Sequence, residues 1–173
     1  MYQADRLYNE LMEADKAVRA LKVKDEATVA EYVWLHTQLI YDHKELGNVF
    51  DLYADDAQLR RENGLCLNGA HAIMKEALKL TAAFPDMKLQ LRDRFAVKKG
   101  KEYKVFLYYS MSGTNKNASL SGPATKRALE GDKCISMTMA TLQEIGGRWR
   151  IVREFTMHSM ECLKAACRPE TDI

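Results

Sequence analysis

The sequence lacks several features that would assign it to a specialised class of protein. No uninterrupted apolar run is long enough to span a bilayer. Lysine and arginine (26) nearly balance aspartate and glutamate (24), so a formal charge of +2 gives no basis for binding nucleic acid or a membrane. Because the first residues, MYQADRLYNELMEAD, contain no apolar segment of the kind found in secretory signals, we expect a cytoplasmic protein.

Metal-binding and cofactor-binding patterns are also scarce. The cysteines have no zinc-site spacing, and we expect reduced thiols at Cys66, Cys134, Cys162 and Cys167. No two histidines have the i, i+4 spacing of a helical metal site. Phosphate-binding loops, dinucleotide glycine patterns and nucleophile elbows are missing as well. The sequence therefore predicts neither a metal nor a cofactor.

The sequence does contain clear helical patterns in its first half. At 173 residues it suits one domain with a sizeable core. Residues 27–46 predict a largely buried helix, and 69–81 predict another that Pro85 ends. Residues 1–24 predict an amphipathic helix, whose stripe fits either packing on its own domain or a subunit contact. That stripe consists of Leu7, Leu11, Ala14, Val18 and Leu21.

After Pro85 the hydrophobic period changes to that of strands. Residues 46–59 predict a short helix that runs into a turn at Asp55 and Asp56, and 112–124 predict a loop. Strand patterns cover 89–97, 103–113, 133–145 and 149–160. Helices followed by consecutive strands indicate an α+β fold with a curved antiparallel sheet. We divide the chain into an amphipathic helix (1–24), an α+β barrel domain (25–163) and a C-terminal tail (164–173).

Strict alternation predicts which side chains of the last strand face the concave side of the sheet. Arg153 and Ser159 share the parity of Trp149, Ile151, Phe155 and Met157, whereas Val152, Glu154, Thr156 and His158 point the other way. A charge among apolar side chains needs a partner. We therefore expect Arg153 to pair with Asp93, which shares the parity of Leu89, Leu91 and Phe95, either as part of a site or as a purely structural ion pair.

Six short segments together resemble a known family. They are LYADDAQL at 52–59, NGAHAI at 68–73, FPDM at 84–87, SGTN at 112–115, GPATKR at 122–127 and GGRWRIVRE at 146–154. Their order and spacing, over roughly residues 26–163, resemble the SnoaL-like branch of the nuclear-transport-factor-2-like superfamily. The resemblance implies a cone-shaped antiparallel sheet closed by helices around a hydrophobic cavity. The superfamily includes polyketide cyclases, steroid isomerases, dehydratases and non-enzymatic binding modules, so fold alone does not assign function.

The residues that act in relatives of this branch are mostly replaced here. The acid on the final strand of the cyclases aligns with Ser159, next to His158, and Asn115 stands where their GTH motif has its histidine. Asp42 matches a catalytic aspartate of the dehydratase-like branch, but Thr37 stands at its tyrosine position. The resemblance therefore transfers no complete catalytic set.

Two hypotheses of function remain. The first is a cofactor-independent acid–base lyase, isomerase or cyclase acting on a hydrophobic polycyclic or polyketide-like molecule, with His36, Tyr32 and Asp42 as catalytic groups. The second is a non-catalytic ligand-binding or oligomerisation module. We expect a homodimer, with a trimer as the alternative. The expected substrate-binding residues are Asp93, Arg153, Tyr109, Asn115, Phe155, Met137, Met139, Met157, Ser159 and His158.

Overall fold

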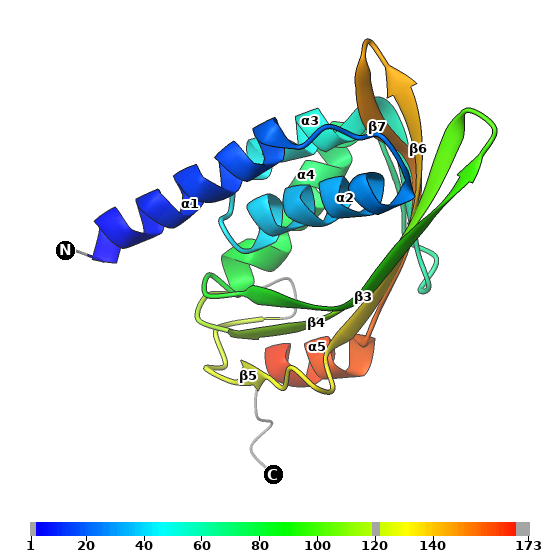
Figure 1. Ribbon diagram of the computed structural model, residues 1–173. Helices are drawn as coiled ribbons and strands as arrows, with labels where there is room; N and C mark the ends of the chain where they lie inside the picture. Colours follow the sequence, from blue (N-terminus) through cyan, green and yellow to red (C-terminus); the bar gives the residue numbers. More distant parts are fainter. Residues whose placement is uncertain (1–2, 119–121, 169–173) are drawn as a thin grey trace.

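A strongly curled sheet wraps around two helices in the computed structural model, which describes residues 3–118 and 122–168 (Figure 1). Residues 119–121 of the predicted loop, 1–2 and the end of the tail lie outside the described residues. The helices are α1 (Gln3–Ala20), α2 (Glu26–Tyr41), η1 (Leu46–Asn48), α3 (Val49–Leu52), α4 (Ala70–Ala83) and α5 (Met160–Cys167). The strands are β1 (Tyr53–Arg61), β2 (Cys66–Asn68), β3 (Lys88–Lys99), β4 (Glu102–Thr114), β5 (Ala128–Leu129), β6 (Ile135–Ile145) and β7 (Arg148–His158). The predicted α+β cone is confirmed.

The strand order places the last strand in the middle of the sheet. In the described part of the chain the order is β2-β1-β7-β6-β4-β3, with β5 paired to β4. The pairs are antiparallel as predicted, except that β1 runs parallel to β7. The long strands β3, β4, β6 and β7 form because their sequences alternate with period two, and β4 and β7 are also rich in β-branched and aromatic residues.

Strand β1 corrects the predicted turn at Asp55 and Asp56. Both aspartates are exposed within the strand, while Ala57 and Leu59 further along it are buried. The pairing with β7 shifts register between Tyr53 and Gln58, and this irregularity interrupts the alternation that would identify a strand. Pairing with β7 on both sides of the two aspartates, at Tyr53 and from Gln58 onward, thus holds them within the strand despite the low strand propensity of aspartate.

The predicted helices follow local signals at their ends. Helix α2 begins at a capping box, in which Asp25 and Thr28 bond to each other's backbone N–H groups. Helix α4 ends before Pro85, as expected. Both helices lie inside the curve of the sheet (Figure 1). The largest fully buried core side chains include Leu39, Leu52, Phe84, Met87, Met111, Leu142 and Ile151.

Helix α1 packs on its own domain with its second half, which is one of the two alternatives for its apolar stripe, while the subunit contact remains a prediction. Near its end Val18 is buried against the domain. Nearer its beginning, Leu7, Tyr8 and Met12 are exposed, and the helix reaches out past the rest of the molecule (Figure 1). The second half of α1 therefore packs on its own domain, and the first half leaves its apolar side chains uncovered.

The cysteines are all free thiols, and two of them lie close together. Burial and the neighbouring Cys162 raise the pKa of the Cys134 thiol. Among residues 3–118 and 122–168, no three His, Cys, Asp or Glu side chains gather in a way that could hold a metal ion. None of the helices in those ranges combines the length and apolar character needed to cross a bilayer.

Candidate acid–base site inside the cone

A β-bulge in β7 determines which side chains enter the cone. Leu142 of β6 pairs with Ile151, but the preceding Thr141 pairs with Arg153, so Val152 is an extra residue. Beyond this bulge the parity reverses: Glu154, Thr156 and His158 face inward, while Arg153, Phe155 and Met157 face outward. The prediction that Arg153 shares the inner face with Ile151 is therefore wrong, since a single extra residue exchanges the two faces of a strand.

A second bulge acts in the same way on β3. Leu91 pairs with Tyr109 and Asp93 with Tyr108, so Arg92 is the extra residue and Asp93 turns outward. Arg153 lies 3.7 Å from Glu102, and Asp93 accepts a hydrogen bond from the backbone of Arg94. The predicted Arg153–Asp93 pair is therefore not formed. Met137 and Met139 also lie on the outer face, because they pair across the sheet with Met157 and Phe155.

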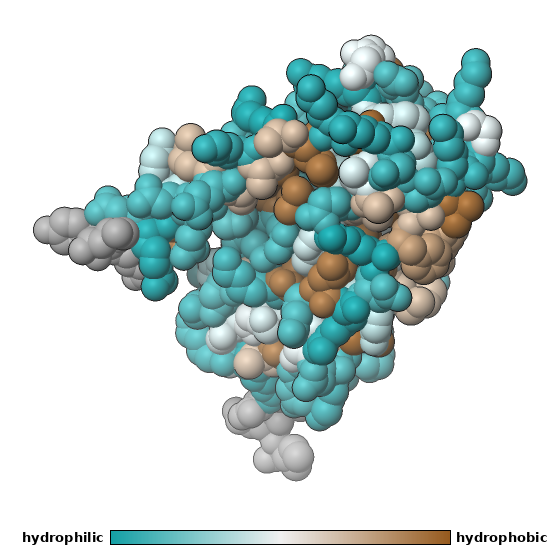
Figure 2. All heavy atoms as spheres, in the orientation of Figure 1, coloured by the Kyte–Doolittle hydropathy of each residue, from teal (hydrophilic) through white to brown (hydrophobic). Residues whose placement is uncertain are grey.

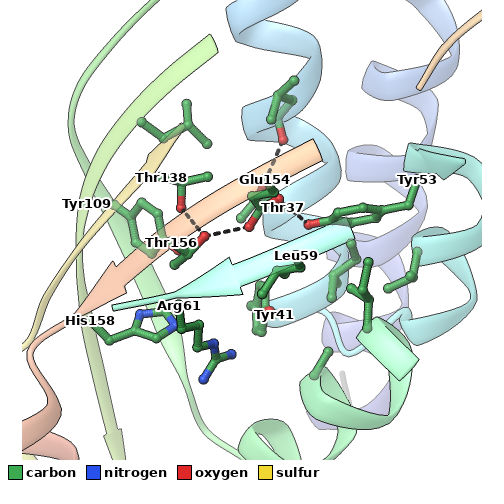
Figure 3. A pocket seen from close by; sticks show the side chains of 16 residues that line it. Thr37, Tyr41, Tyr53, Leu59, Arg61, Tyr109, Thr138, Glu154, Thr156 and His158 are labelled. Carbon is green, nitrogen blue, oxygen red and sulfur yellow. Dashed lines mark hydrogen bonds between the residues drawn. The ribbon is translucent and has the colours of Figure 1, made fainter. Parts of the chain in front are cut away.

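The inner face carries a chain of hydrogen bonds that ends on a carboxylate (Figure 3). The Tyr53 hydroxyl donates to Glu154 Oε2 at 2.6 Å, and Thr156 Oγ1 donates to Glu154 Oε1 at 2.6 Å. Thr156 Oγ1 in turn lies 3.0 Å from Thr138 Oγ1. Each oxygen of the Glu154 carboxylate therefore binds one hydroxyl group of the cone wall.

Burial sets the protonation of this carboxylate. Glu154 as a whole is half-buried, but its carboxylate oxygens bind Tyr53 and Thr156 inside the cone. Removal from water raises the pKa of Glu154, against the lowering effect of the two hydroxyl donors and of Arg61. The pKa of Tyr53 is also raised, by burial and by the neighbouring Glu154. A carboxyl group with a raised pKa can both accept and donate a proton nearer neutral pH than an exposed glutamate.

His158 and Arg61 complete the polar part of the wall (Figure 3). His158 Nδ1 contacts Ser136 Oγ, and burial together with the Arg61 charge lowers the pKa of His158 to about 3. The imidazole is therefore uncharged at neutral pH. Arg61 Nη1 lies 3.4 Å from Glu76 Oε1, while Arg61 Nε is the one buried side-chain nitrogen or oxygen of the described residues that has no hydrogen-bond partner.

The cavity enclosed by these residues is small. Its volume is about 20 Å³, which is room for about one water molecule. Large side chains, Tyr41 and Tyr109 among them, occupy most of the cone. A polycyclic molecule can enter only if the walls move apart. The cavity is lined by Val33, Thr37, Ile40, Tyr41, Val49, Tyr53, Leu59, Arg61, Ile73, Ala77, Leu107, Tyr109, Thr138, Glu154, Thr156 and His158.

The predicted catalytic pair Tyr32 and His36 lies together, but outside the cone. The two rings meet edge to face with centroids 4.4 Å apart. Tyr32 donates to the backbone oxygen of Trp149 at 3.1 Å, and His36 Nδ1 contacts Asn48 Oδ1. Both side chains line a groove of about 630 Å³ between α1, α2 and the β6–β7 hairpin. Their catalytic role remains a prediction, and it concerns this groove rather than the cone.

Asp42, the third predicted catalytic residue, has a separate place. It follows the last turn of α2, and its Oδ1 accepts a hydrogen bond from the backbone of Leu89 at 2.8 Å. Burial raises the pKa of Asp42. Asp42 lines neither the cavity in the cone nor the groove that holds Tyr32 and His36.

The remaining predicted residues divide between the cavity and structural positions. Tyr109 and His158 line the cavity. Asn115 is fully buried and holds the loop after β4, because its Oδ1 accepts from the backbone of Thr125 at 2.8 Å. Ser159 follows β7, and its Oγ accepts from the backbone of Ile135 at 3.1 Å. Thus His158, and not Ser159, faces the cavity.

Glu154, Tyr53, Thr156 and Arg61 were not expected at the site. For Glu154 and Thr156 the sequence does contain a signal: both share the parity of His158, which places three polar side chains on one face of a strand. The apolar side chains of the opposite face made that face look like the interior. For Tyr53 and Arg61 the signal is weaker, because β1 is irregular.

Comparison with known proteins shows similarity only at the level of structure. No protein-family model matches the sequence, and a comparison with curated proteins finds no match either. Among solved structures, IdmH from Streptomyces antibioticus, a candidate polyketide cyclase, is 18% identical with a TM-score of 0.56, over 79% of this chain and 96% of that one. A SnoaL-like protein from Jannaschia sp. CCS1 is 9% identical (TM-score 0.56; 76% of this chain, 88% of that one).

A third structure extends the likeness beyond the cyclases. A nuclear transport factor 2-like superfamily protein from Salmonella enterica serovar Typhimurium is 12% identical with a TM-score of 0.58, over 75% of this chain and 90% of that one. Identities this low establish the fold and leave the chemistry open. The chain therefore has the cone-shaped α+β fold of the SnoaL-like and nuclear-transport-factor-2-like proteins, as the resemblance of its sequence segments implied.

Proposed function

We propose that the cone is a site of cofactor-independent acid–base chemistry on a small molecule, with Glu154 as the group that exchanges the proton. One observation carries the proposal: a buried carboxylate binds hydroxyl groups on both oxygens beside a cavity. Burial gives the Glu154 carboxyl group the raised pKa that proton transfer near neutral pH requires. A carboxylate that served only to stabilise the fold would gain little from such a place, since burial of charge is costly.

The proposed step takes place after the walls of the cone have moved apart to admit the substrate, and it is a proton transfer from a carbon next to a carbonyl group. The C–H bond breaks, the proton goes to an oxygen of ionised Glu154, and the electron pair moves onto the carbonyl oxygen. Uncharged His158 and Tyr109 are among the hydrogen-bonding side chains that line the same cavity, and groups of this kind stabilise the charge that develops on that oxygen. In an isomerisation the electron pair returns from the oxygen to the carbon skeleton, and a different carbon atom takes the proton back. In a dehydration the electron pair forms a carbon–carbon double bond while the C–O bond of a hydroxyl group breaks, and Glu154 gives its proton to that hydroxyl group, which leaves as water.

Hydrogen exchange tests this proposal without knowledge of the natural substrate. Small cyclic ketones are incubated with the protein in D₂O, and loss of the C–H signals next to the carbonyl is followed by NMR. The wild-type chain is expected to accelerate exchange, and Glu154→Gln to reduce that acceleration about a hundredfold. Glu144→Gln, which changes an exposed glutamate on the adjacent strand β6, is the control and should exchange like the wild type. Equal rates for both variants, or no acceleration by the wild type, would contradict the proposal.

The outer face of the sheet supports a second role, assembly of two copies. Its apolar side chains line a shallow groove of about 280 Å³. Met137 is 50% exposed and Phe155 38% exposed, well above the exposure of core residues. An apolar area is visible at the right of Figure 2. We define this outer patch as Phe95, Phe106, Tyr108, Met137, Met139, Phe155 and Met157.

We propose that the outer patch joins two copies of this chain around a twofold axis. Exposed apolar patches of this kind mark interaction sites, and a twofold interface uses the same patch on both copies. Sedimentation equilibrium of the wild-type chain is expected to give the mass of a dimer. A trimeric mass would contradict this proposal and would indicate that copies meet through another surface, for instance the uncovered beginning of α1.

A further inference from the structure

A cleft between α4 and α5 combines an apolar lining with an excess of positive charge. Its volume is about 160 Å³, larger than that of the cavity inside the cone. Its apolar walls come from α4 with the turn that follows it and from α5. The lining residues are Arg61, Glu76, Lys79, Leu80, Ala83, Phe84, Met160, Leu163, Lys164 and Cys167.

Arg61 connects this cleft with the candidate acid–base site. Of the described residues, it is the one that lines both the cleft and the cavity inside the cone. Its side chain is only 11% exposed, and its Nε is buried without a hydrogen-bond partner. A buried donor of this kind is rare in folded proteins, because leaving it unpaired is costly. An acceptor supplied by a ligand would satisfy it.

The charges around Arg61 favour an anionic acceptor. Among the residues that the structure describes, Glu76 is the one carboxylate that lines the cleft, and it is shared: its Oε1 lies 3.4 Å from Arg61 Nη1 and its Oε2 lies 3.3 Å from Lys79 Nζ. Lys164 adds a third cation, whose partner Glu161 is mostly exposed. Three cations thus face a single carboxylate across the cleft, and Arg61 is the most deeply buried of them.

We infer that the cleft binds a hydrophobic carboxylate. The planar guanidinium of Arg61 matches a carboxylate group in a forked arrangement, and a small turn of the side chain would bring its buried Nε to the ligand. The apolar body of the ligand would then lie along Leu80, Phe84 and Met160, since one charged end and an apolar wall suit an amphipathic acid. Binding of this acid does not depend on the proposed function of Glu154. A role of the acid as the substrate would rest on that function.

Binding of a matched pair of probes tests the inference. Phenylacetate and its neutral counterpart phenylacetamide are titrated into the wild-type chain, and affinities are measured by NMR chemical-shift changes. The carboxylate is expected to bind at least about tenfold more tightly than the amide, because hydrogen bonds to charged groups are the stronger ones. This comparison needs no variant and therefore does not depend on how a substitution affects folding.

Two variants then assign the effect to Arg61. Arg61→Gln is expected to bind phenylacetate about tenfold more weakly, and Arg61→Lys to lie between it and the wild type. Arg60→Gln is the matched control, because Arg60 is the neighbouring arginine on β1 and lines an outer groove instead. It should bind phenylacetate like the wild type.

The outcomes separate this inference from the proposed function. Equal affinity for acid and amide, or equal binding by the Arg61→Gln and Arg60→Gln variants, would overturn the carboxylate site whatever the exchange experiment shows. Glu154→Gln should bind phenylacetate as tightly as the wild type or more tightly, because it removes a negative charge near Arg61. A carboxylate site that persists in a chain without exchange activity would leave the inference standing and the acid–base proposal refuted.

Discussion

We expect the free energy of unfolding to fall by about 3 kcal/mol when the pH is lowered from about 7 to about 4, because His158 is buried in its uncharged form. Burial and the charge of Arg61 lower the pKa of His158 from 6.5 to about 3 in the folded chain. The unfolded chain therefore takes up a proton at a pH where the folded chain does not. The stabilisation is fully present above about pH 6.5, and it is lost as the pH falls towards about 3.

Urea unfolding at a series of pH values measures this effect. His158→Gln keeps a polar side chain next to Ser136 but removes the titrating ring, so its stability should vary less with pH than that of the wild type. His71→Gln, which replaces an exposed histidine on α4, should follow the wild-type curve. Glu154 acts in the opposite direction, because its raised pKa favours the folded state at low pH, so the difference between variant and wild type is the quantity to compare. Parallel curves for all three proteins would show that His158 titrates normally.

Complete dissociation of the proposed dimer is the expected result of placing two acidic residues in the outer patch. Met139 and Phe155 lie directly opposite each other on β6 and β7. In a Met139→Glu, Phe155→Glu double variant, like charges would face each other within a contact that excludes water. Such charges are destabilising both across a strand pair and in an interface. Because both side chains face outward, the fold of the monomer should persist.

The matched control also replaces two exposed apolar residues, but outside the outer patch. Leu78 lies on α4 and Ile145 at the end of β6, where they are 46% and 41% exposed. Leu78→Glu with Ile145→Glu should leave the dimer intact in sedimentation equilibrium, and both double variants should retain the circular dichroism of the wild type. A dimer that survives Met139→Glu with Phe155→Glu would show that copies meet elsewhere.

The types of the main elements could be predicted because periodicity is a local property. Helices α2 and α4 and strands β3, β4, β6 and β7 follow patterns that a short window of sequence contains. The faces of the strands could not be predicted in the same way. One extra residue at Val152 and another at Arg92 reverse the alternation of inward and outward side chains. No pattern in the neighbouring sequence indicates either bulge.

The candidate site was predicted least well, because the apolar side chains of these strands lie on the outer face of the sheet and not, as is usual, in the interior. The apolar character of Phe155 and Met157 predicts that they line the cavity, whereas they lie on the outer face. Glu154 and Thr156, which were assigned outward, are the polar groups of the cavity wall. Polar side chains face the enclosed cavity and apolar side chains face outward, which is the reverse of the usual strand with its apolar face buried and its polar face exposed.

The position of β7 has a consequence for how the protein is made. Strand β7 follows the other described strands in the sequence, yet it stands between β1 and β6, so the sheet cannot close until residue 158 has left the ribosome. Until then the nascent chain has two unpaired strand edges, and closing the gap requires contacts between residues about a hundred positions apart. Synthesis that stops before residue 148 would leave both edges open to other chains. Premature termination is therefore a route to aggregation in this topology, while a completed chain buries both edges in one step.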